Sequence, residues 1–248
     1  MNLKPIERAG QPRDQINGRA GLPRQVPQVW RAQIPPIRPA FPHSIPQKPF
    51  GELAERAAGF MLLAAAAPVI MVSASVTAAL SGQPPFVAHR RVGQYGRMFW
   101  MLKLRTMWPS ECARPAGSGW VERIVADTAS GEKDPGDPRV TSRFARFCRR
   151  HSIDELPQLW HVVRGEMSLV GPRPVTGSEL FYYGDRLSEL LGVKPGITGL
   201  WQVTGRSVVK FPERASLDLQ MARSKGLKQY FGILLRTIPV VITGKGAW

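Results

Sequence analysis

The 248-residue sequence contains little cysteine and few acidic residues. Its only cysteines, Cys112 and Cys148, lie far apart and outside any CxxC spacing, which excludes a disulfide framework and a cysteine zinc site. The 18 Asp and Glu residues are outnumbered by 34 Lys and Arg residues, so the formal net charge is +16. This excess favours an anionic partner: nucleic acid, an anionic membrane or a phosphorylated substrate.

Common phosphate and metal motifs are also missing. The sequence has no GxxxxGK[ST], no GxGxxG between a strand and a helix, no HExxH and no EF-hand pattern. His151 and His161 are not spaced as a metal pair and are expected to be ordinary packed or exposed histidines. Any phosphate chemistry must therefore use another arrangement of side chains.

Residues 1–50 contain ten prolines and eight Lys or Arg, but only two acids. Proline at this density opposes helix formation, and the apolar content is too low for a core. We expect a disordered basic tail, which is either a solvated leader or weakly attracted to an anionic membrane.

Residues 57–80 form a long uncharged, apolar run within a predicted membrane segment, 51–85. A helix of this length would span roughly 36 Å, enough to cross a bilayer core of about 30 Å. Pro68 lies at its middle and should break the helix into halves too short to span alone. Basic residues flank both sides of the run, and such residues favour the cytosol. A re-entrant helix–break–helix hairpin is favoured over a true span or a buried core helix.

The remaining chain, 86–248, is predicted to be a cytosolic catalytic domain, mainly α with a small β-hairpin at 86–105 and with amphipathic interfacial helices. Residues 107–137 are predicted to be loop. The sequence predicts helices over 140–151, from Ser152 to about Val163, over 179–191, and over 213–242 with a break near Lys225-Gly226. The first of these helices should have one apolar side and one arginine side. The apolar side is Val140, Phe144, Phe147 and Cys148, and the other is Arg143, Arg146, Arg149 and Arg150.

Two adjacent acids, Asp154 and Glu155, lie at the predicted start of the second helix. The spacing Ser152-x-x-Glu155 is typical of a capping box, which would account for the acids without any chemistry. Arginines lie just upstream, however, and a positive field keeps a carboxylate ionised. Such a carboxylate can attack phosphorus or bind a hard cation such as Mg²⁺.

Three further basic positions are candidates for phosphate binding. Arg173 lies between two prolines, so its turn would hold a guanidinium with little entropy left to lose. Lys103 and Arg105 alternate along one strand and should share a face. A plain turn is the alternative for Arg173. The arginine face of the predicted 140–151 helix is either a solvated surface or a site that binds phosphate or lipid headgroups.

Several ordered motifs in residues 50–248 resemble those of the bacterial sugar transferase family, the monotopic phosphoglycosyl transferases. They are Arg90-Arg91-Val92-Gly93, Lys103-Leu104-Arg105-Thr106-Met107, Asp137-Pro138-Arg139-Val140-Thr141, Asp154-Glu155-Leu156-Pro157-Gln158, the Gly165–Pro174 segment, Lys194-Pro195-Gly196-Ile197-Thr198-Gly199 and Gly244-Lys245-Gly246-Ala247. Each motif alone is weak, but their combined order is specific. The chain resembles the short catalytic form of the family.

This resemblance implies transfer of a sugar-1-phosphate from a UDP-sugar to undecaprenyl phosphate, with release of UMP, as the first membrane step of exopolysaccharide or glycoconjugate synthesis. Asp154 would be the nucleophile that forms an aspartyl-phosphosugar intermediate, and Glu155 would help to hold Mg²⁺. The phosphate-binding positions that it implies are Lys103, Arg149 and Arg173, with Asp218 as a late acid in the same site. Pro68 matches the family's helix-breaking proline.

The resemblance places the protein at the cytoplasmic face of a bacterial inner membrane. Its expected partners are a UDP-sugar, undecaprenyl phosphate and membrane lipid, with a homo-oligomer left open and no nucleic acid. Three positions depart from the family: Ala67 replaces a common Ser, His161 a common Asn and Tyr230 a common Asp. A nucleic-acid binder would explain the charge but not the apolar run or the paired acids, and an inactive membrane scaffold is the third hypothesis.

Overall fold

The computed structural model describes residues 51–108, 119–124, 140, 142–205, 209, 211–224 and 226–244. All of these lie within one compact unit of the chain. The predicted tail at 1–50 lies outside the described residues. The described part is mainly helical with small sheets, which confirms the mainly α part of the predicted fold class with its small β-hairpin.

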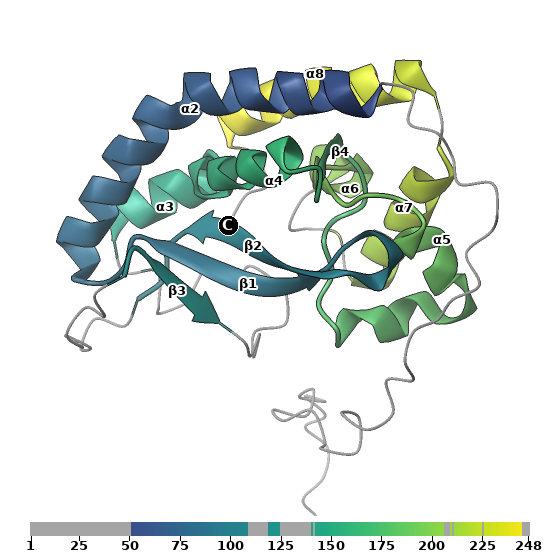
Figure 1. Cartoon of the computed structure of the whole chain (residues 1–248), viewed down its shortest axis with the longest axis horizontal. Helices are drawn as coiled ribbons and strands as arrows, with labels where there is room; N and C mark the ends of the chain where they lie inside the picture. Colours follow the sequence, from purple (N-terminus) through teal and green to yellow (C-terminus); the bar gives the residue numbers. More distant parts are fainter. Residues whose placement is uncertain are drawn as a thin grey trace, which may run out of the picture. The chain divides into compact units, whose positions relative to one another are not determined.

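Helix α2, Glu52–Ser81, contains the apolar run. It is long and apolar enough to cross a membrane by length and composition. The predicted break at Pro68 is instead a proline inside one unbroken helix, whose ribbon bends along its length in Figure 1. Proline lacks the N–H that would bond to the carbonyl of Ala64, and loss of one such bond bends a helix without ending it. Gly82 then ends α2 in the left-handed conformation.

The predicted hairpin is present. Strand β1, Phe86–Val92, pairs antiparallel with β2, Met98–Leu104, and a short 3-10 turn, η1 (Gln94–Gly96), joins them. Strand β3, Val121–Ile124, adds in parallel to β1, so the loop prediction for 107–137 was wrong at these four residues. Their pairing depends on an edge offered by a distant strand, which local composition does not encode.

A second, two-stranded parallel sheet joins β4, Ser168–Val170, to β5, Gly196–Thr198. Here the two glycine motifs meet: Gly171 N donates to Thr198 O at 2.9 Å, and Gly196 N donates to Pro172 O at 2.7 Å. A Cβ on Gly196 would come within 2.0 Å of the nitrogen of Gly171. Both glycines are therefore needed for close backbone approach.

The arginine-rich helix is shorter than predicted, and its buried side differs. Helix α3 spans Arg143–Arg150, and Ser142 Oγ caps it by accepting from Phe144 N at 3.1 Å. Its buried residues are Ala145, Cys148 and Arg149, whereas Phe147 is exposed. The prediction that Phe147 packs inside and Arg149 faces out was wrong, because tertiary packing selects a different side of this short helix.

The segment after α3 is a 3-10 helix, η2 (Ile153–Gln158), followed by a short helix, α4 (Leu159–Val163). The predicted helix over 179–191 is divided into η3, Glu179–Arg186, and α5, Leu187–Leu191, with non-helical backbone at Gly184. Helix α6, Leu200–Thr204, follows β5. The predicted break in the C-terminal region is confirmed: α7 spans Phe211–Arg223 and α8 spans Leu227–Thr243.

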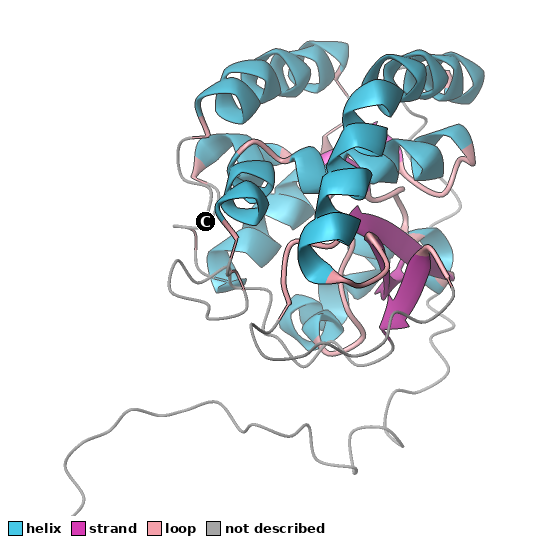
Figure 2. Ribbon diagram, turned by 90° about the vertical axis from the view of Figure 1, so that its left-hand side faces the viewer, coloured by secondary structure: helices cyan, strands magenta, loops and turns pink. Residues whose placement is uncertain are grey.

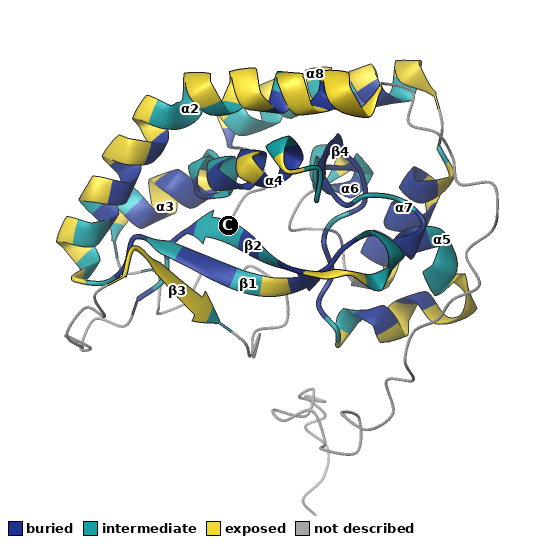
Figure 3. Cartoon of the chain, viewed as in Figure 1, coloured by how far each residue is buried: buried dark blue, intermediate teal, exposed yellow. Residues whose placement is uncertain are grey.

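The long helices α2 and α8 lie on the same side of the molecule, above the strands (Figures 1 and 2). The main core lies beneath them, where Met101 and Phe99 of β2 pack with Val162, Met167 and Ile233. Outward faces of both helices are exposed, as Figure 3 shows. Their large exposed apolar side chains are Leu53, Phe60, Met61, Leu62, Val69, Met71, Val72 and Leu80 of α2, and Leu227, Phe231, Leu235, Ile238 and Ile242 of α8.

Candidate active site

The acid pair is not held by a capping box. Ser152 has a left-handed backbone, with φ of 56°, and its side chain makes no capping hydrogen bond. Element η2 packs instead against β2 and α2. The structure therefore removes the local explanation for Glu155 and leaves tertiary partners to account for it.

Lys103 of β2 is the tertiary partner of Glu155. Its Nζ lies 3.1 Å from Glu155 Oε1, and both side chains are about nine-tenths buried, at 13% and 14% exposed. A partly desolvated ion pair of this kind is held more strongly than a surface pair. Two residues that the sequence placed 52 positions apart are thus in direct contact.

Asp154 is more deeply placed, at 3% exposed. Burial raises the pKa of the Cys148 thiol to about 11, and the negative charge of nearby Asp154 adds to this rise. Arg149 is buried in the last turn of α3, just before η2. Asp154, the predicted nucleophile, is therefore buried in η2 near α3.

Arg173 is positioned by Asp218 of α7. The backbone N–H of Arg173 donates to Asp218 Oδ1 at 3.1 Å, and the Tyr183 hydroxyl donates to Oδ2 at 3.2 Å. Burial raises the pKa of Asp218 to about 7, and the bonds from Arg173 and Tyr183 oppose that rise. Asp218 thus fixes the Gly-Pro-Arg-Pro turn through its backbone.

Glu155 and Arg173 line a common cavity of about 470 Å³. Arg214, Trp201 and Gln202 line it too, while its apolar walls include residues of α2 and α8. Two cations lie near the Trp201 ring: the guanidinium of Arg173 is 5.6 Å from the ring centre and that of Arg214 is 4.9 Å from it. One cavity therefore joins an acid, two guanidinium groups and an apolar passage.

Arg105 lies in a different environment from Lys103. Its Nε donates to Pro84 O at 2.8 Å, and its Nη2 pairs with Glu122 of β3. These bonds join the end of β2 to the loop before β1 and to the added strand. In this structure Arg105 is held by protein acceptors, so its predicted phosphate contact stays a prediction.

A magnesium ion would need ligands from its substrates here. Among the described residues, no group of three or more His, Cys, Asp or Glu side chains is placed to hold a metal. Adjacent acids of which one, Glu155, lines a cavity fit Mg²⁺ in its usual form, with one or two carboxylates plus phosphate oxygens and water. The donor set is therefore compatible with Mg²⁺ brought by a nucleotide.

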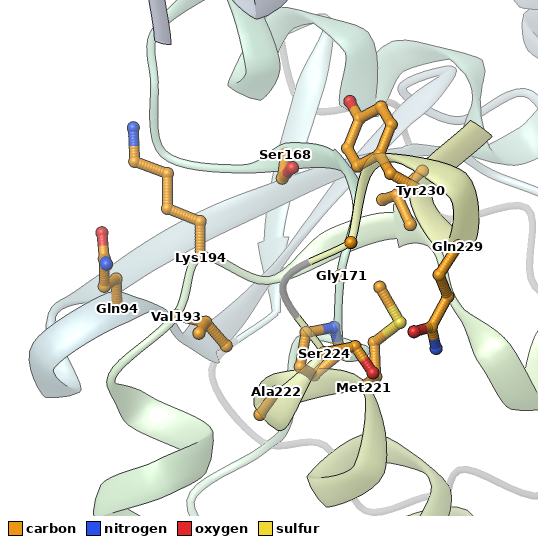
Figure 4. A pocket seen from close by; sticks show the side chains of 13 residues that line it. Gln94, Ser168, Gly171, Val193, Lys194, Met221, Ala222, Ser224, Gln229 and Tyr230 are labelled. Carbon is orange, nitrogen blue, oxygen red and sulfur yellow. The ribbon is translucent and has the colours of Figure 1, made fainter. Parts of the chain in front are cut away.

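A second carboxylate network was missed by the sequence argument. Glu55 of α2 is 2% exposed, and its Oε1 accepts from Leu169 N at 3.0 Å and Tyr230 Oη at 2.8 Å. Ser168 Oγ also donates to it. Ser168 and Tyr230 border a small cavity of about 70 Å³ (Figure 4). Glu55 thus ties α2 to β4 and α8.

Other contributors, Trp201, Arg214 and Tyr183, were also missed. Tyr183 and Arg214 carry no local signal, because each lies in a helix whose pattern only indicates amphipathicity. Trp201 lies two residues after the Lys-Pro-Gly-Ile-Thr-Gly motif, and an aromatic side chain near that motif was the one available hint.

Comparisons with known proteins identify the family of this chain. The model of the family described as bacterial sugar transferase matches residues 47–244, and the chain belongs to that family. It is 43% identical over 175 residues to the UDP-galactose-lipid carrier transferase of Erwinia amylovora, which covers 67% of the chain and 35% of that relative.

Two further relatives differ in length. The undecaprenyl-phosphate galactose phosphotransferase of Salmonella typhimurium is 38% identical over 194 residues, covering 76% of the chain and 39% of the relative. The exopolysaccharide production protein ExoY of Rhizobium meliloti is 36% identical over 214 residues, covering 81% of the chain and 91% of the relative. The chain thus spans under half of the first two relatives and nearly all of the third.

Proposed function

We propose that the protein transfers a sugar-1-phosphate from a UDP-sugar to undecaprenyl phosphate and releases UMP. The observation that carries this proposal is a cavity lined by Glu155, the neighbour of Asp154, and by Arg173, whose apolar walls belong to helices with exposed apolar faces. The names of the relatives from Erwinia amylovora and Salmonella typhimurium support a sugar donor and a lipid acceptor. Both substrates are anions, so a site with nearby cations is required.

In the first step, a carboxylate oxygen of Asp154 attacks the sugar-bearing phosphorus of the UDP-sugar. The new bond joins that oxygen to phosphorus, and the bond from phosphorus to the bridging oxygen breaks, so UMP leaves. Lys103 and Arg173 offset the negative charge that develops on the phosphoryl oxygens. Lys103 is held in place by Glu155, at 3.1 Å.

In the second step, a phosphate oxygen of undecaprenyl phosphate attacks the same phosphorus. The bond to Asp154 breaks, and its carboxylate is restored. Covalent catalysis in this form divides one difficult displacement into two easier ones. The steps predict ping-pong kinetics, and a sequential mechanism with a ternary complex would contradict them.

Mg²⁺ is proposed as the cofactor, held by Glu155 with phosphate oxygens of the donor. The metal supplies charge neutralisation for the departing UMP. Glu155 already contacts Lys103, so the same side chain would orient both a metal and an ammonium group. Asp154 then stays available as the nucleophile.

The membrane arrangement is proposed to be monotopic at the cytoplasmic face of the inner membrane, with the unbroken helix α2 lying against the domain rather than crossing the bilayer. Buried residues occur along α2 from Glu55 to Thr77, so the helix packs on the domain from its first turn to its last. A true span would carry one end about 30 Å away from a domain on one side of the bilayer. The exposed apolar faces of α2 and α8 would enter the lipid instead.

The test is UMP release by the detergent-solubilised protein with Mg²⁺, undecaprenyl phosphate and a panel of UDP-sugars. We expect UMP from at least one donor and none from Asp154→Asn. No UMP from any donor, with folded protein, would contradict the proposal and favour a membrane scaffold. Detergent dependence gives a second readout, since a nucleic-acid binder should remain soluble without it.

A further inference from the structure

The cavity that α2 and α8 help to line has two chemically different kinds of lining side chain, apolar and cationic. Its apolar walls come from the middle of α2 and the second half of α8: Leu62, Ala65, Ala66, Leu234, Val240 and Val241. Arg173, Arg214 and Trp201 lie among its remaining lining residues. Leu62 is 48% exposed, so this wall continues into the outer apolar face of α2. A ligand that fits the whole cavity has an anionic head and an apolar tail.

Arg214 of α7 is the buried cation of this cavity, at 6% exposed. Its Nε donates to Val209 O at 2.6 Å, and its guanidinium lies 4.9 Å from the centre of the Trp201 ring. Both contacts fix the orientation of the group in advance, so little entropy is lost when it binds an anion. A guanidinium held in this way suits bidentate contact with phosphate.

Trp201 provides an independent indication of a ligand. The residue is 6% exposed, and its Nε1 is buried with no hydrogen-bond partner among the described residues. A buried N–H without an acceptor is costly, and a bound anion would remove that cost. Arg173 lies 5.6 Å from the same ring, so two cations share one indole. An anion between them would also relieve their mutual repulsion.

We propose that Arg214, together with Trp201, binds the phosphate of the polyprenyl phosphate acceptor, while the first isoprene units lie between α2 and α8. This inference rests on the proposed function and assigns the acceptor to one part of its site. The nucleotide donor fits this end less well, because its phosphates are flanked on both sides by polar groups. The donor is assigned to the Lys103 and Glu155 side of the site.

The test compares Arg214→Gln with Arg223→Gln, a matched change on the same helix. Arg223 is 59% exposed and pairs with Glu189 at 2.7 Å, away from the proposed machinery. Two reactions are measured: exchange of labelled UMP into UDP-sugar without lipid, and product formation over a range of undecaprenyl phosphate concentrations. Thermal unfolding in detergent confirms that both variants are folded.

For Arg214→Gln we expect the KM for undecaprenyl phosphate to rise about tenfold or more, because a charge-assisted contact is lost. Lipid-free exchange should stay within about twofold of wild type, and Arg223→Gln should match wild type in both reactions. Equal loss of exchange and product formation would place Arg214 in the donor site and overturn the proposal. An unchanged KM for the lipid would overturn it as well.

A second variant, Ala65→Phe, narrows the apolar part without altering the cations. It should raise the KM for undecaprenyl phosphate and leave exchange unchanged, and an unchanged KM would contradict the assigned path. If wild type forms product but shows no exchange, the covalent mechanism fails rather than the lipid site. The lipid site is then judged by the KM values alone.

Discussion

Two buried carboxylate clusters in this protein have opposite surroundings. Glu55 accepts hydrogen bonds from two hydroxyl groups and one backbone N–H, supplied by α8 and β4. Glu155 faces the Lys103 ammonium group and lines a cavity, with Asp154 beside it. Both acids occupy the first turn of a helical segment. Position within a helix therefore does not distinguish an acid with a structural role from an acid with a proposed catalytic role.

The difference lies in what each cluster joins. Glu55 joins three elements through groups that satisfy one another, which stabilises an arrangement. Glu155, next to Asp154 in the chain, contacts a cation and lines an accessible cavity that a substrate can enter. The comparison predicts loss of activity without loss of stability at one cluster, and the reverse at the other.

Replacing Asp154 by Asn should have the largest effect on activity. Without a carboxylate nucleophile, turnover should fall at least about a thousandfold, since the covalent step is lost. The free energy of unfolding should change by less than about 1 kcal/mol, because the amide is of similar size. Steady-state UMP release and denaturant unfolding measure the two quantities. A strongly destabilised Asp154→Asn protein would contradict the predicted difference from Glu55, because Asp154 would then also have a structural role.

Replacing Glu55 by Ala should have the largest effect on stability. The change leaves the Tyr230 hydroxyl, the Ser168 hydroxyl and the Leu169 N–H without their acceptor, at a cost of about 3 kcal/mol or more. Denaturant unfolding in detergent measures this loss. Tyr230→Phe is the matched control and should cost about 1 kcal/mol. If Glu55→Ala is as stable as wild type but inactive, Glu55 belongs to the chemistry instead.

Asp218 is intermediate between Glu55 and Asp154 in its expected role, because it stabilises the fold and also positions the backbone of Arg173. Burial raises its pKa to about 7 in the fold, against 3.8 for an ordinary Asp. Its contribution to stability is therefore present at low pH and is lost as pH rises through about 7. Relative to Asp218→Asn, wild type should lose about 2 kcal/mol between pH 5 and pH 7. Parallel pH profiles of unfolding for the two proteins would contradict this assignment.

Replacing His161 should have the smallest effect on the free energy of unfolding, and that effect should change with pH in the opposite direction to the effect at Asp218. Its Nε2 accepts from Leu102 N at 3.0 Å, and its Nδ1 lies 2.6 Å from Glu166. Burial lowers the pKa of His161, although Glu166 opposes this. Its stabilising contribution, about 1 kcal/mol, is present above about pH 6.5 and is lost as pH falls through the folded pKa. The difference in unfolding free energy between wild type and His161→Ala should shrink on acidification, and growth of the difference would refute this.

Much of this arrangement was accessible from the sequence because it is local. Apolar runs predicted α2, a glycine turn predicted the hairpin, and a Lys-Gly pair predicted the break between α7 and α8. The Asp154-Glu155 motif, with Lys103 and Arg173, was identified by resemblance, and the structure brings Lys103 to Glu155. These features depend on short stretches whose residue types carry their own signal.

Features that depend on distant partners were not predicted. Glu55 was not singled out from the sequence, and only the fold shows that Ser168 and Tyr230 donate to it. The capping box at Ser152 satisfied its local pattern but does not form, because Ser152 takes a left-handed backbone. Arg149 was expected on the side of its helix opposite the apolar side and is buried. At Ser152 the tertiary structure outweighs a local capping preference of about 1 kcal/mol.

The most direct test of the central claim is the intact mass of the protein after incubation with Mg²⁺ and its UDP-sugar donor in the absence of lipid. We predict a mass increase equal to one sugar-phosphate group. Peptide sequencing should locate this group on Asp154, and added undecaprenyl phosphate should remove it. Asp154→Asn should show no increase. A wild-type protein that releases UMP only when lipid is present, and never gains mass, would contradict the account.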